Sequence, residues 1–555
     1  MLKPALLLMT FLVIQSAIIT ASAAPPDAGA LLQQNQPVKP PQPSSGDTGL
    51  VIAPEPLSSV PTSAAFMVTR IDIVGNTVFE SGILHALVAD AEGRKLTLNE
   101  LVNVVANISD YYHLHGYPLA RAFIPAQTMH DGVVQVQVLE AHYGQVSLNN
   151  SSLANDEVLN SVLANLVGGS QVQQTQLDRT LLLLSDIPGV TTTAIIKPGD
   201  QVGTSDLLID AKATPAWNAS LLFDDYGNRY TGRARHSGTV EWIDPFSSGD
   251  TLNLNALTTG KNMNSLGLSY ETQLSGQGAR IGGELSALHY ILGDSLSAIG
   301  GHGTAETAGL WMKYPWQRST TVNVYTQLEY NYKKLNDAID STGIHTDRHV
   351  NSVTLSLSGD VRDNFLAGAV TTWSVAWKAG ELNFDNAAAQ SLDASSAQTQ
   401  GGFVKWNANY ARLQNLFDDT QLYLALASQW ANNNLDSSDK MVAGGPDTVR
   451  AYDMGAVSGD SGILANLELR QHLSDIGGHW QAIAFVDGEH VSINRSPWTA
   501  DVNRVKLAGP GLGLNWNNES GWHAKIMVAA PMGSAPALTG EGKKVRGWAE
   551  IGSFF

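Results

Sequence analysis

TVNVYTQLEYNY, at residues 321–332, alternates apolar and polar side chains over nearly its whole length. Successive side chains of an extended chain leave opposite faces, so this alternation predicts a β-strand with one apolar face and one polar face. The apolar face carries Val322, Val324, Leu328, Tyr330 and Tyr332, and the polar face carries Asn323, Gln327, Glu329 and Asn331. Residues 462–473 show the same pattern, so the strand is one of a series.

Similar segments recur from Ala216 to Phe555, separated by turns rich in Gly, Asn, Asp and Ser. We count roughly sixteen, each about ten residues long, which is the length and even number typical of outer-membrane barrels. A soluble β-sandwich would alternate as well. However, a continuous strand region of this length favours a closed barrel with a wet interior, because closure leaves no sheet edge in lipid. The sequence therefore predicts a sixteen-stranded antiparallel transmembrane β-barrel at residues 215–555.

Two copies of one small α+β unit precede the strands, at residues 65–141 and 142–214. In the first copy a strand is followed by two segments whose apolar residues recur at spacings of three and four, the pattern of a helical face. Two further strands complete the unit. The second copy repeats the order strand, helix, helix, strand, strand, which indicates a tandem repeat.

The N-terminus has the pattern of a secretory signal peptide at residues 1–24. Lys3 precedes an apolar run at 5–20, and small residues follow it. Residues 25–64 are rich in Pro, Ser and Gln, which predicts an extended linker. Within this linker, residues 27–36 are compatible with a short plug helix or with an unstructured tail. After the N-terminus no apolar run is long enough for a transmembrane helix.

Composition excludes several classes of function. The chain has no cysteine, so disulfides and thiol chemistry contribute nothing. Its net charge of −18 argues against nucleic-acid binding, which requires a basic surface. The histidines of H-x-H at 113–115 and H-x-D-x-H at 345–349, a helix end and an expected loop, lack the further ligands of a metal site. No nucleophile motif stands out, so we predict no metal, no cofactor and no enzymatic activity.

A long loop at residues 431–460 interrupts the alternation and contains GGPDTVRAY. Loops of this length in compact folds are usually functional or disordered. In the strand at 480–491, Phe485 and Asp487 share one face, and the opposite face has small apolar residues suited to lipid. Asp487 is therefore expected to point inward, where Arg450 of an infolded loop would contact it in a charge-assisted pair. The alternative is an ordinary surface loop with a solvated arginine. Glu468 and Arg470 are expected to line the polar interior.

These segments together resemble the two-partner secretion transporter (TpsB) family, of the ShlB/FhaC/HecB type that exports haemolysins and adhesins. The α+β units resemble POTRA domains in IDIVGNTVF (71–79), GVVQVQVLEAHYGQV (132–146) and LDRTLLLLSDIPGV (177–190), and FDDYGNRYTGR (223–233) resembles the start of the barrel. FVDGEHV (485–491) resembles the strand motif F-x-D-x-G, with Gly488 one residue early. The loop resembles the motif VRG(Y/F), with Ala451 in place of glycine. Its motif residues are Gly444, Gly445, Val449, Arg450, Ala451 and Tyr452.

The resemblance implies a pore in the outer membrane of a Gram-negative bacterium. Periplasmic POTRA domains would bind the N-terminal secretion domain of a large exoprotein (TpsA type), which would cross the barrel without ATP. We expect binding by β-augmentation or along a POTRA groove. Four apolar residues of the second repeat either contact the passenger or form core: Leu181, Leu184, Ile187 and Val190. Phe555 would serve as a signal for the barrel-assembly machinery, and the pore would be a monomer in lipid.

Two other interpretations remain open at the level of sequence, one within transport and one of a different class. A barrel-assembly factor of the BamA type has the same parts but usually more POTRA repeats. A diffusion porin or a surface adhesin would need no periplasmic repeats.

Overall fold

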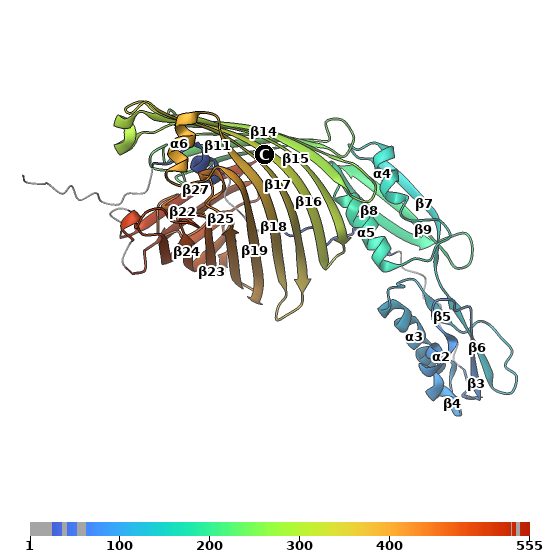
Figure 1. The fold of residues 1–555 in the computed structure, drawn as a ribbon. Helices are drawn as coiled ribbons and strands as arrows, with labels where there is room; N and C mark the ends of the chain where they lie inside the picture. Colours follow the sequence, from blue (N-terminus) through green and yellow to red (C-terminus); the bar gives the residue numbers. More distant parts are fainter. Residues whose placement is uncertain (1–24, 36–41, 53–62, 534–535, 540–543) are drawn as a thin grey trace, which may run out of the picture.

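A computed structural model describes residues 25–35, 42–52, 63–533, 536–539 and 544–555. The signal peptide expected at residues 1–24 lies outside this part of the chain. A closed antiparallel barrel forms most of the structure, and two α+β units project from one of its ends (Figure 1). Among the described residues, no helix has the length and apolar character needed to cross a membrane.

Each barrel strand is hydrogen-bonded to the next, and the last strand pairs with the first, so the predicted sixteen-stranded barrel is confirmed. The closing pair joins residues 220–224 to residues 550–554. In order around the wall, the strands are β10 (Trp217–Asp224), β11 (Arg235–Ile243), β12 (Thr251–Thr258), β13 (Met263–Gln273), β14 (Arg280–Ile291), β15 (Gly301–Arg318), β16 (Val322–Ile339), β17 (Ile344–Asp363), β18 (Ala369–Phe384), β19 (Gly401–Phe417), β20 (Thr420–Ala431), β23 (Ser461–Ser474), β24 (His479–Ser492), β25 (Arg504–Asn517), β26 (Trp522–Ala529) and β27 (Arg546–Phe554).

The wall of the barrel is unequal in height. Strand β10 has 8 residues and β17 has 20, so the expectation of a uniform length near ten residues was wrong for β15–β19. Twenty residues tilted by about 40° rise about 50 Å, roughly twice the apolar band of an outer-membrane barrel. Because β15 ends at Arg318 beside the second α+β unit, its additional residues lie at the far end (Figure 1).

The extra residues of β16 and β17 were not recognised as strand in the sequence, because they are mostly polar. Residues 333–337, KKLND, lie beyond the strand predicted at 321–332, and residues 345–349 were expected to be a loop. The structure places them in β16 and β17, where they pair with each other. Beyond the apolar band a strand no longer needs one apolar face, because its outer side meets water.

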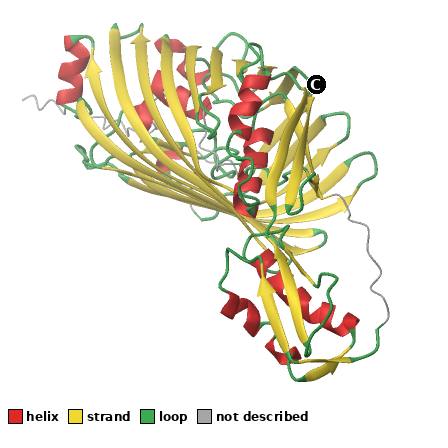
Figure 2. Cartoon of the chain, turned by 90° about the vertical axis from the view of Figure 1, so that its right-hand side faces the viewer, coloured by secondary structure: helices red, strands yellow, loops and turns green. Residues whose placement is uncertain are grey.

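The first α+β unit has β2 (Phe66–Val68), β3 (Arg70–Val74), α2 (Ser81–Ala86), η1 (Ala89–Ala91), β4 (Arg94–Leu96), α3 (Leu98–Leu114), β5 (Arg121–Phe123) and β6 (Val133–Leu139). Helix α3 begins with a capping box, in which Thr97 and Glu100 satisfy each other's backbone N–H groups. It buries Leu101, Val105 and Ile108 against the sheet β3-β6-β5. This unit is the part of the molecule farthest from the barrel (Figure 2).

The second unit has β7 (His142–Ser151), α4 (Asp156–Leu163), α5 (Gln174–Ser185), β8 (Val190–Pro198) and β9 (Thr204–Ala213). It adjoins the barrel, where Arg318 at the end of β15 donates to the carboxylate of Asp186 at 2.7 and 2.8 Å.

Glu140 joins the two units. Its buried carboxylate accepts hydrogen bonds from Thr77, Val78 and Tyr112 of the first unit and from Gln171 of the second. Burial alone would raise the pKa of Glu140, but the hydrogen bonds outweigh it and hold that pKa below its ordinary value. The carboxylate is therefore charged at neutral pH and fixes the joint between the units.

The linker begins with a helix, α1 (Ala28–Asn35), which is the helical outcome of the two left open by the sequence. Its residues Ala28, Leu31 and Leu32 are buried among side chains on the inner face of β13–β16. Residues 42–52 continue toward the second unit, where β1 (Leu50–Ile52) pairs with β8. The described parts of the linker thus lie at both ends of the barrel interior.

Candidate functional site in the barrel interior

The loop between β20 and β23 folds into the barrel. It contains the turn η3 (Ser437–Asp439) and a small hairpin of β21 (Met441–Ala443) and β22 (Val457–Gly459). The motif residues Val449, Ala451 and Tyr452 are buried against the inner wall, in a cluster that includes Phe485 and Trp548. The surface-loop alternative is therefore wrong.

Gly444 and Gly445 allow the tight path that leads into the motif. Their φ angles are +84° and +127°, which side chains rarely tolerate. A Cβ on Gly444 would lie 2.6 Å from the carbonyl oxygen of Asp453, so any other residue would also clash.

Arg450 and Asp487 form a bidentate ion pair on the inner wall. The Nε and Nη2 groups of Arg450 donate to the two carboxylate oxygens at 2.9 and 2.7 Å, and its backbone N–H donates at 3.0 Å. Arg450 is 3% exposed and Asp487 is fully buried. A charged pair removed from water is stable only when its geometry is good and its remaining hydrogen bonds are satisfied, as they are here.

Glu468 is a second partner of Arg450, a role that the sequence did not assign. Its Oε1 accepts from Arg450 at 2.6 Å, and its Oε2 accepts from Arg470 at 2.7 and 2.8 Å. Two arginines and two carboxylates therefore balance their charges. The ring of Phe485 lies 3.4 Å from the Arg450 guanidinium in a cation–π contact. Alternation along β23 and β24 placed Glu468, Arg470, Phe485 and Asp487 inward, but only the structure shows which of them meet Arg450.

Ala451 departs from the glycine of the family motif without strain. Its φ angle is not positive, so no left-handed conformation is required. Its methyl group lies against Gly509 of β25, where an added Cβ would come within 2.4 Å of it. The extra methyl at position 451 is therefore accommodated by the absence of one on the facing strand.

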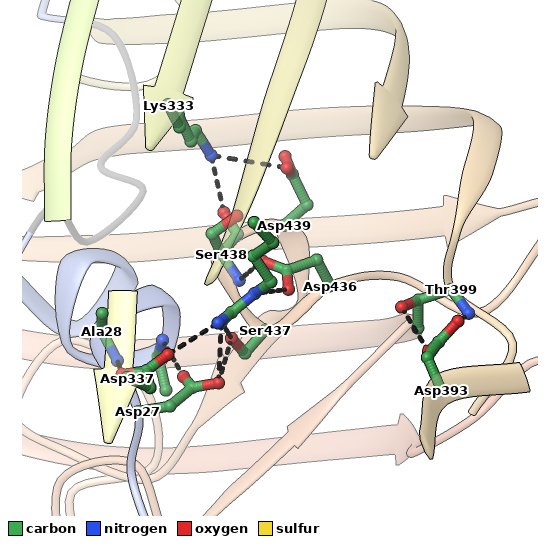
Figure 3. A network of polar contacts seen from close by, with 12 residues as sticks. Asp27, Ala28, Lys333, Asp337, Asp393, Thr399, Asp436, Ser437, Ser438 and Asp439 are labelled. Atoms are coloured by element: carbon green, nitrogen blue, oxygen red, sulfur yellow. Dashed lines mark hydrogen bonds and ion pairs between the residues drawn. The ribbon is translucent and has the colours of Figure 1, made fainter. Parts of the chain in front are cut away.

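A second cluster, the lysine cluster, holds the beginning of the loop. The carboxylate of Asp439, 1% exposed, lies 3.4, 2.5 and 3.1 Å from the amino groups of Lys333, Lys378 and Lys405. Figure 3 shows Lys333 reaching Asp439 and the carbonyl of Ser438. The sequence could not predict this cluster, because its lysines come from three strands and nothing local marks their convergence.

A third cluster joins helix α1, the loop and the wall through Arg348 of β17. Its guanidinium lies 2.9 Å from Asp27, 2.6 Å from Asp337 and 2.5 Å from Asp436. Asp27 also accepts from the Ser437 hydroxyl at 2.8 Å (Figure 3). The lysine and Arg348 clusters together contain four cations and four carboxylates, so the helix and the loop are held by a neutral but highly charged network.

Other candidate residues have different surroundings. Leu181, Leu184, Ile187 and Val190 are at most 5% exposed and lie in the core of the second unit, so of the two alternatives left open by the sequence the structure supports the core. Phe555 is exposed, and its backbone N–H donates to Ala219 on the first barrel strand. Within the described ranges no group of three or more His, Asp or Glu side chains is arranged so that it could hold a metal ion.

Comparison with known proteins shows the family to which a chain with this arrangement belongs. The chain matches the family model of the haemolysin secretion/activation protein ShlB/FhaC/HecB over residues 203–516, and that of the ShlB-type POTRA domain over residues 66–141. The chain belongs to the ShlB/FhaC/HecB family. This family is one of transporters and not of enzymes.

Its relatives include the heme/hemopexin transporter protein HuxB of Haemophilus influenzae, which is 25% identical over 519 residues, 91% of each chain. The outer membrane transporter CdiB of Escherichia coli is 23% identical over 494 residues, 84% of this chain and 81% of CdiB. The solved structure of Escherichia coli CdiB has the same fold, with a TM-score of 0.71, 17% identity and coverage of 91% and 93% of the two chains. The protein is thus an outer-membrane transporter of the TpsB type, a two-partner secretion pore with its POTRA domains in the periplasm.

Proposed function

We propose that this pore recognises an unfolded partner exoprotein in the periplasm through its POTRA domains and exports it through the barrel without ATP. The observation that carries the proposal is the content of the barrel interior. Helix α1 lies inside it and is held to the wall and to the loop through the charged side chain of Asp27. A permanent core would be apolar, whereas contacts of this kind can be exchanged for water.

Space for a polypeptide exists beside the loop motif. A cavity of about 440 Å³ lies among Gln42 of the linker, Arg450 of the loop, and Asn409, Glu468 and Arg470 of the wall. Its lining is mixed, and the polar groups of Asn409, Glu468 and Arg470 offer hydrogen-bonding partners to an extended chain, whose amide groups require them throughout transit.

Helix α1 closes the far end of this path in the resting protein. Asp27 fixes it to Arg348 and Ser437, and Gln33 donates to the carbonyl of Ser438 at 2.5 Å. The pore opens when these contacts of α1 break, and binding of the passenger to the POTRA domains triggers this step. Folding of the passenger outside the cell then supplies the direction of transport, since the sequence has no P-loop for nucleotide.

The proposal is tested by secretion of a co-expressed exoprotein. Because HuxB is named a heme/hemopexin transporter, an exoprotein that binds hemopexin is the first cargo to test, and a haemolysin is the second. We expect export into the medium only when the transporter is present, with the exoprotein retained in the periplasm otherwise. Equal export with an empty vector, or no export of any large exoprotein encoded beside the transporter, would contradict the proposal.

A further inference from the structure

The turn between β11 and β12, residues 244–250, is closed by two carboxyl groups. The Oδ1 atom of Asp244 accepts from the backbone N–H groups of Gly249 and Asp250 at 2.8 and 3.3 Å. The Oδ1 atom of Asp250 accepts from the hydroxyl and the backbone N–H of Ser248 at 2.9 and 3.1 Å. The two side chains therefore hold the ends of the turn together.

The backbone of this turn is strained. Asp244 and Ser247 have φ angles of +55° and +56°, in the left-handed region that costs a residue with a side chain about 1–2 kcal/mol. Gly249 lies in the same region, at +67°, without that cost. The closed shape therefore depends on the hydrogen bonds that the two carboxyl groups accept.

The second POTRA domain packs directly on this turn. The backbone N–H of Asn155, at the start of α4, donates to the Ser247 carbonyl at 3.1 Å. A Cβ on Gly249 would lie 3.0 Å from the Cγ2 of Ile187 and 3.5 Å from the Cγ1 of Val158. Because the domain touches the backbone of the turn itself, a change in the shape of the turn would shift or release the domain.

The remaining oxygens of the two carboxyl groups are buried. Asp244 is 6% exposed and Asp250 is fully buried. In the described part of the chain, no N–H or hydroxyl group donates to the Oδ2 atom of either residue. A hydrogen bond between the two carboxyl groups satisfies these oxygens, and such a bond exists only when one of the groups carries a proton.

The surroundings decide which aspartate carries that proton. Burial, and next the neighbouring Asp250, raise the pKa of Asp244 to about 6. Burial also opposes the charge of Asp250, but hydrogen bonds from Asp244 and Ser248 outweigh it and hold the pKa of Asp250 below its ordinary value. In the closed turn Asp244 is therefore the protonated partner and Asp250 the charged one.

The other titratable groups around the pair leave this assignment unchanged. On the barrel side, the hydroxyl of Tyr270 in β13 faces Asp250 and favours its charged form. Arg280 of β14 donates to the Gly249 carbonyl at 3.1 Å, but its charge is already paired with Glu271.

The second POTRA domain also brings no counter-charge to the pair. On the segments that pack against the turn, Asp156 and Glu157 are exposed, and Asp186 is paired with Arg318. The proton itself therefore provides the neutralisation that the closed turn needs.

We propose that one proton, shared by Asp244 and Asp250, stabilises the closed turn and so holds the second POTRA domain against the barrel, and that loss of this proton loosens the joint. With both groups charged, two buried carboxylates repel each other inside a strained turn. Because the pKa of Asp244 is higher in the closed turn than in water, the closed form is favoured in acid, and this advantage is lost as the pH rises from about 4 to about 6. The inference concerns the joint and does not depend on export of a passenger.

Spin labels can measure the joint in the full chain in detergent, because the chain has no native cysteine. Val202→Cys on the second POTRA domain and Phe365→Cys in a barrel turn use positions that are 91% and 65% exposed. We expect one narrow distribution of label distances at pH 5 and a loosened population about tenfold larger at pH 7.5, as a pKa of about 6 in the closed turn requires. A distribution that is the same at both pH values would overturn the proposal.

Substitutions at position 244 separate the proton from the turn. Asp244→Asn keeps the accepting oxygen and supplies a permanent N–H donor to Asp250, so it should give the narrow distribution at both pH values. Asp244→Ala removes both functions and should give the loosened population at both. Asp418→Asn, which changes an exposed carboxylate in another turn of the barrel, is the matched control and should respond to pH as the parent does. The heat-dependent gel shift shows that each variant has a folded barrel, and a pH response retained by Asp244→Asn would overturn the proposal.

A bound cation would be another way to neutralise two carboxylates. The described residues place no third His, Asp or Glu side chain where the three could hold a metal ion, so we expect neither calcium nor EDTA to change the distances at pH 7.5. If calcium narrows the distribution at that pH and EDTA reverses the effect, the pair binds a metal ion and the proposal is wrong.

Discussion

The loop motif and helix α1 occupy the same interior but are held by different means. The motif has a bidentate pair between buried charges, a second carboxylate, a cation–π contact and an apolar cluster around it. Helix α1 buries three small or aliphatic side chains, and its ion pair uses Asp27, whose side chain is 36% exposed. We propose that the first arrangement is an anchor and that the second is a contact that can open. On this proposal one barrel holds a fixed element and a displaceable one side by side.

The largest effect is expected at the fixed element. Arg450→Ala leaves two buried carboxylates without their shared cation, a loss of about 3–5 kcal/mol in anchoring. Secretion should fall more than tenfold while the barrel still assembles, because the sixteen-stranded ladder does not depend on the loop. Secretion into the medium and the heat-dependent gel shift of the folded barrel measure the two properties separately.

Arg450→Lys serves as the matched control. It keeps the charge but not the bidentate geometry, so it should fall between the parent and the Ala variant. Undiminished secretion by Arg450→Ala would contradict the description of the motif as an anchor.

An intermediate effect is expected where the loop approaches α1. Asp439→Asn keeps the size of the side chain but leaves Lys333, Lys378 and Lys405 without a counter-charge, with a cost of about 1.5–3 kcal/mol for lost charged hydrogen bonds. We expect faster proteolysis of residues 432–440 in the folded protein and weaker secretion than the parent. Asp439→Glu, which retains the charge, is the control. A proteolysis pattern identical to that of the parent would show that the lysine cluster does not help to anchor the loop.

The smallest effect is expected at the displaceable element. Asp27→Asn weakens one partly exposed ion pair, a loss of about 0.5–1 kcal/mol, and leaves the loop contacts of Arg348 intact. The open fraction of the pore should rise about two- to fivefold in planar-bilayer conductance, without loss of secretion. Asp27→Glu should behave like the parent. A secretion defect as large as that of Arg450→Ala would show that α1 is a fixed element too.

Period-two alternation was enough to predict the closed barrel and the inward direction of the Asp487 side chain. Both predictions depend only on which face of a strand each side chain lies on. Strand length failed as a prediction at residues 333–337 and 345–349, where hydrogen bonds continue in water and no apolar face marks them. Leu181 and its neighbours were ambiguous for another reason. An apolar helix face looks the same in sequence whether it meets a core or a partner, and only packing distinguishes the two.

Contacts between distant strands were beyond prediction. Arg348 gathers Asp27, Asp337 and Asp436 across more than 400 positions of sequence, and charge alone gave no reason to choose these aspartates among the acidic residues. The pairing of β1 with β8 was equally hidden, because three residues in a proline-rich linker have no recognisable strand pattern.

Because the barrel strands differ in length, the outer end of the pore is taller on one flank than on the other. Strand β17, with 20 residues, rises about 25 Å more than the apolar band of an outer-membrane barrel requires, whereas β10, with 8 residues, rises only about 20 Å at the same tilt. On the proposed function, a polypeptide that leaves the lumen meets the tall strands β15–β19 on one flank and water on the other. We therefore expect its first folded turns to form on the low flank.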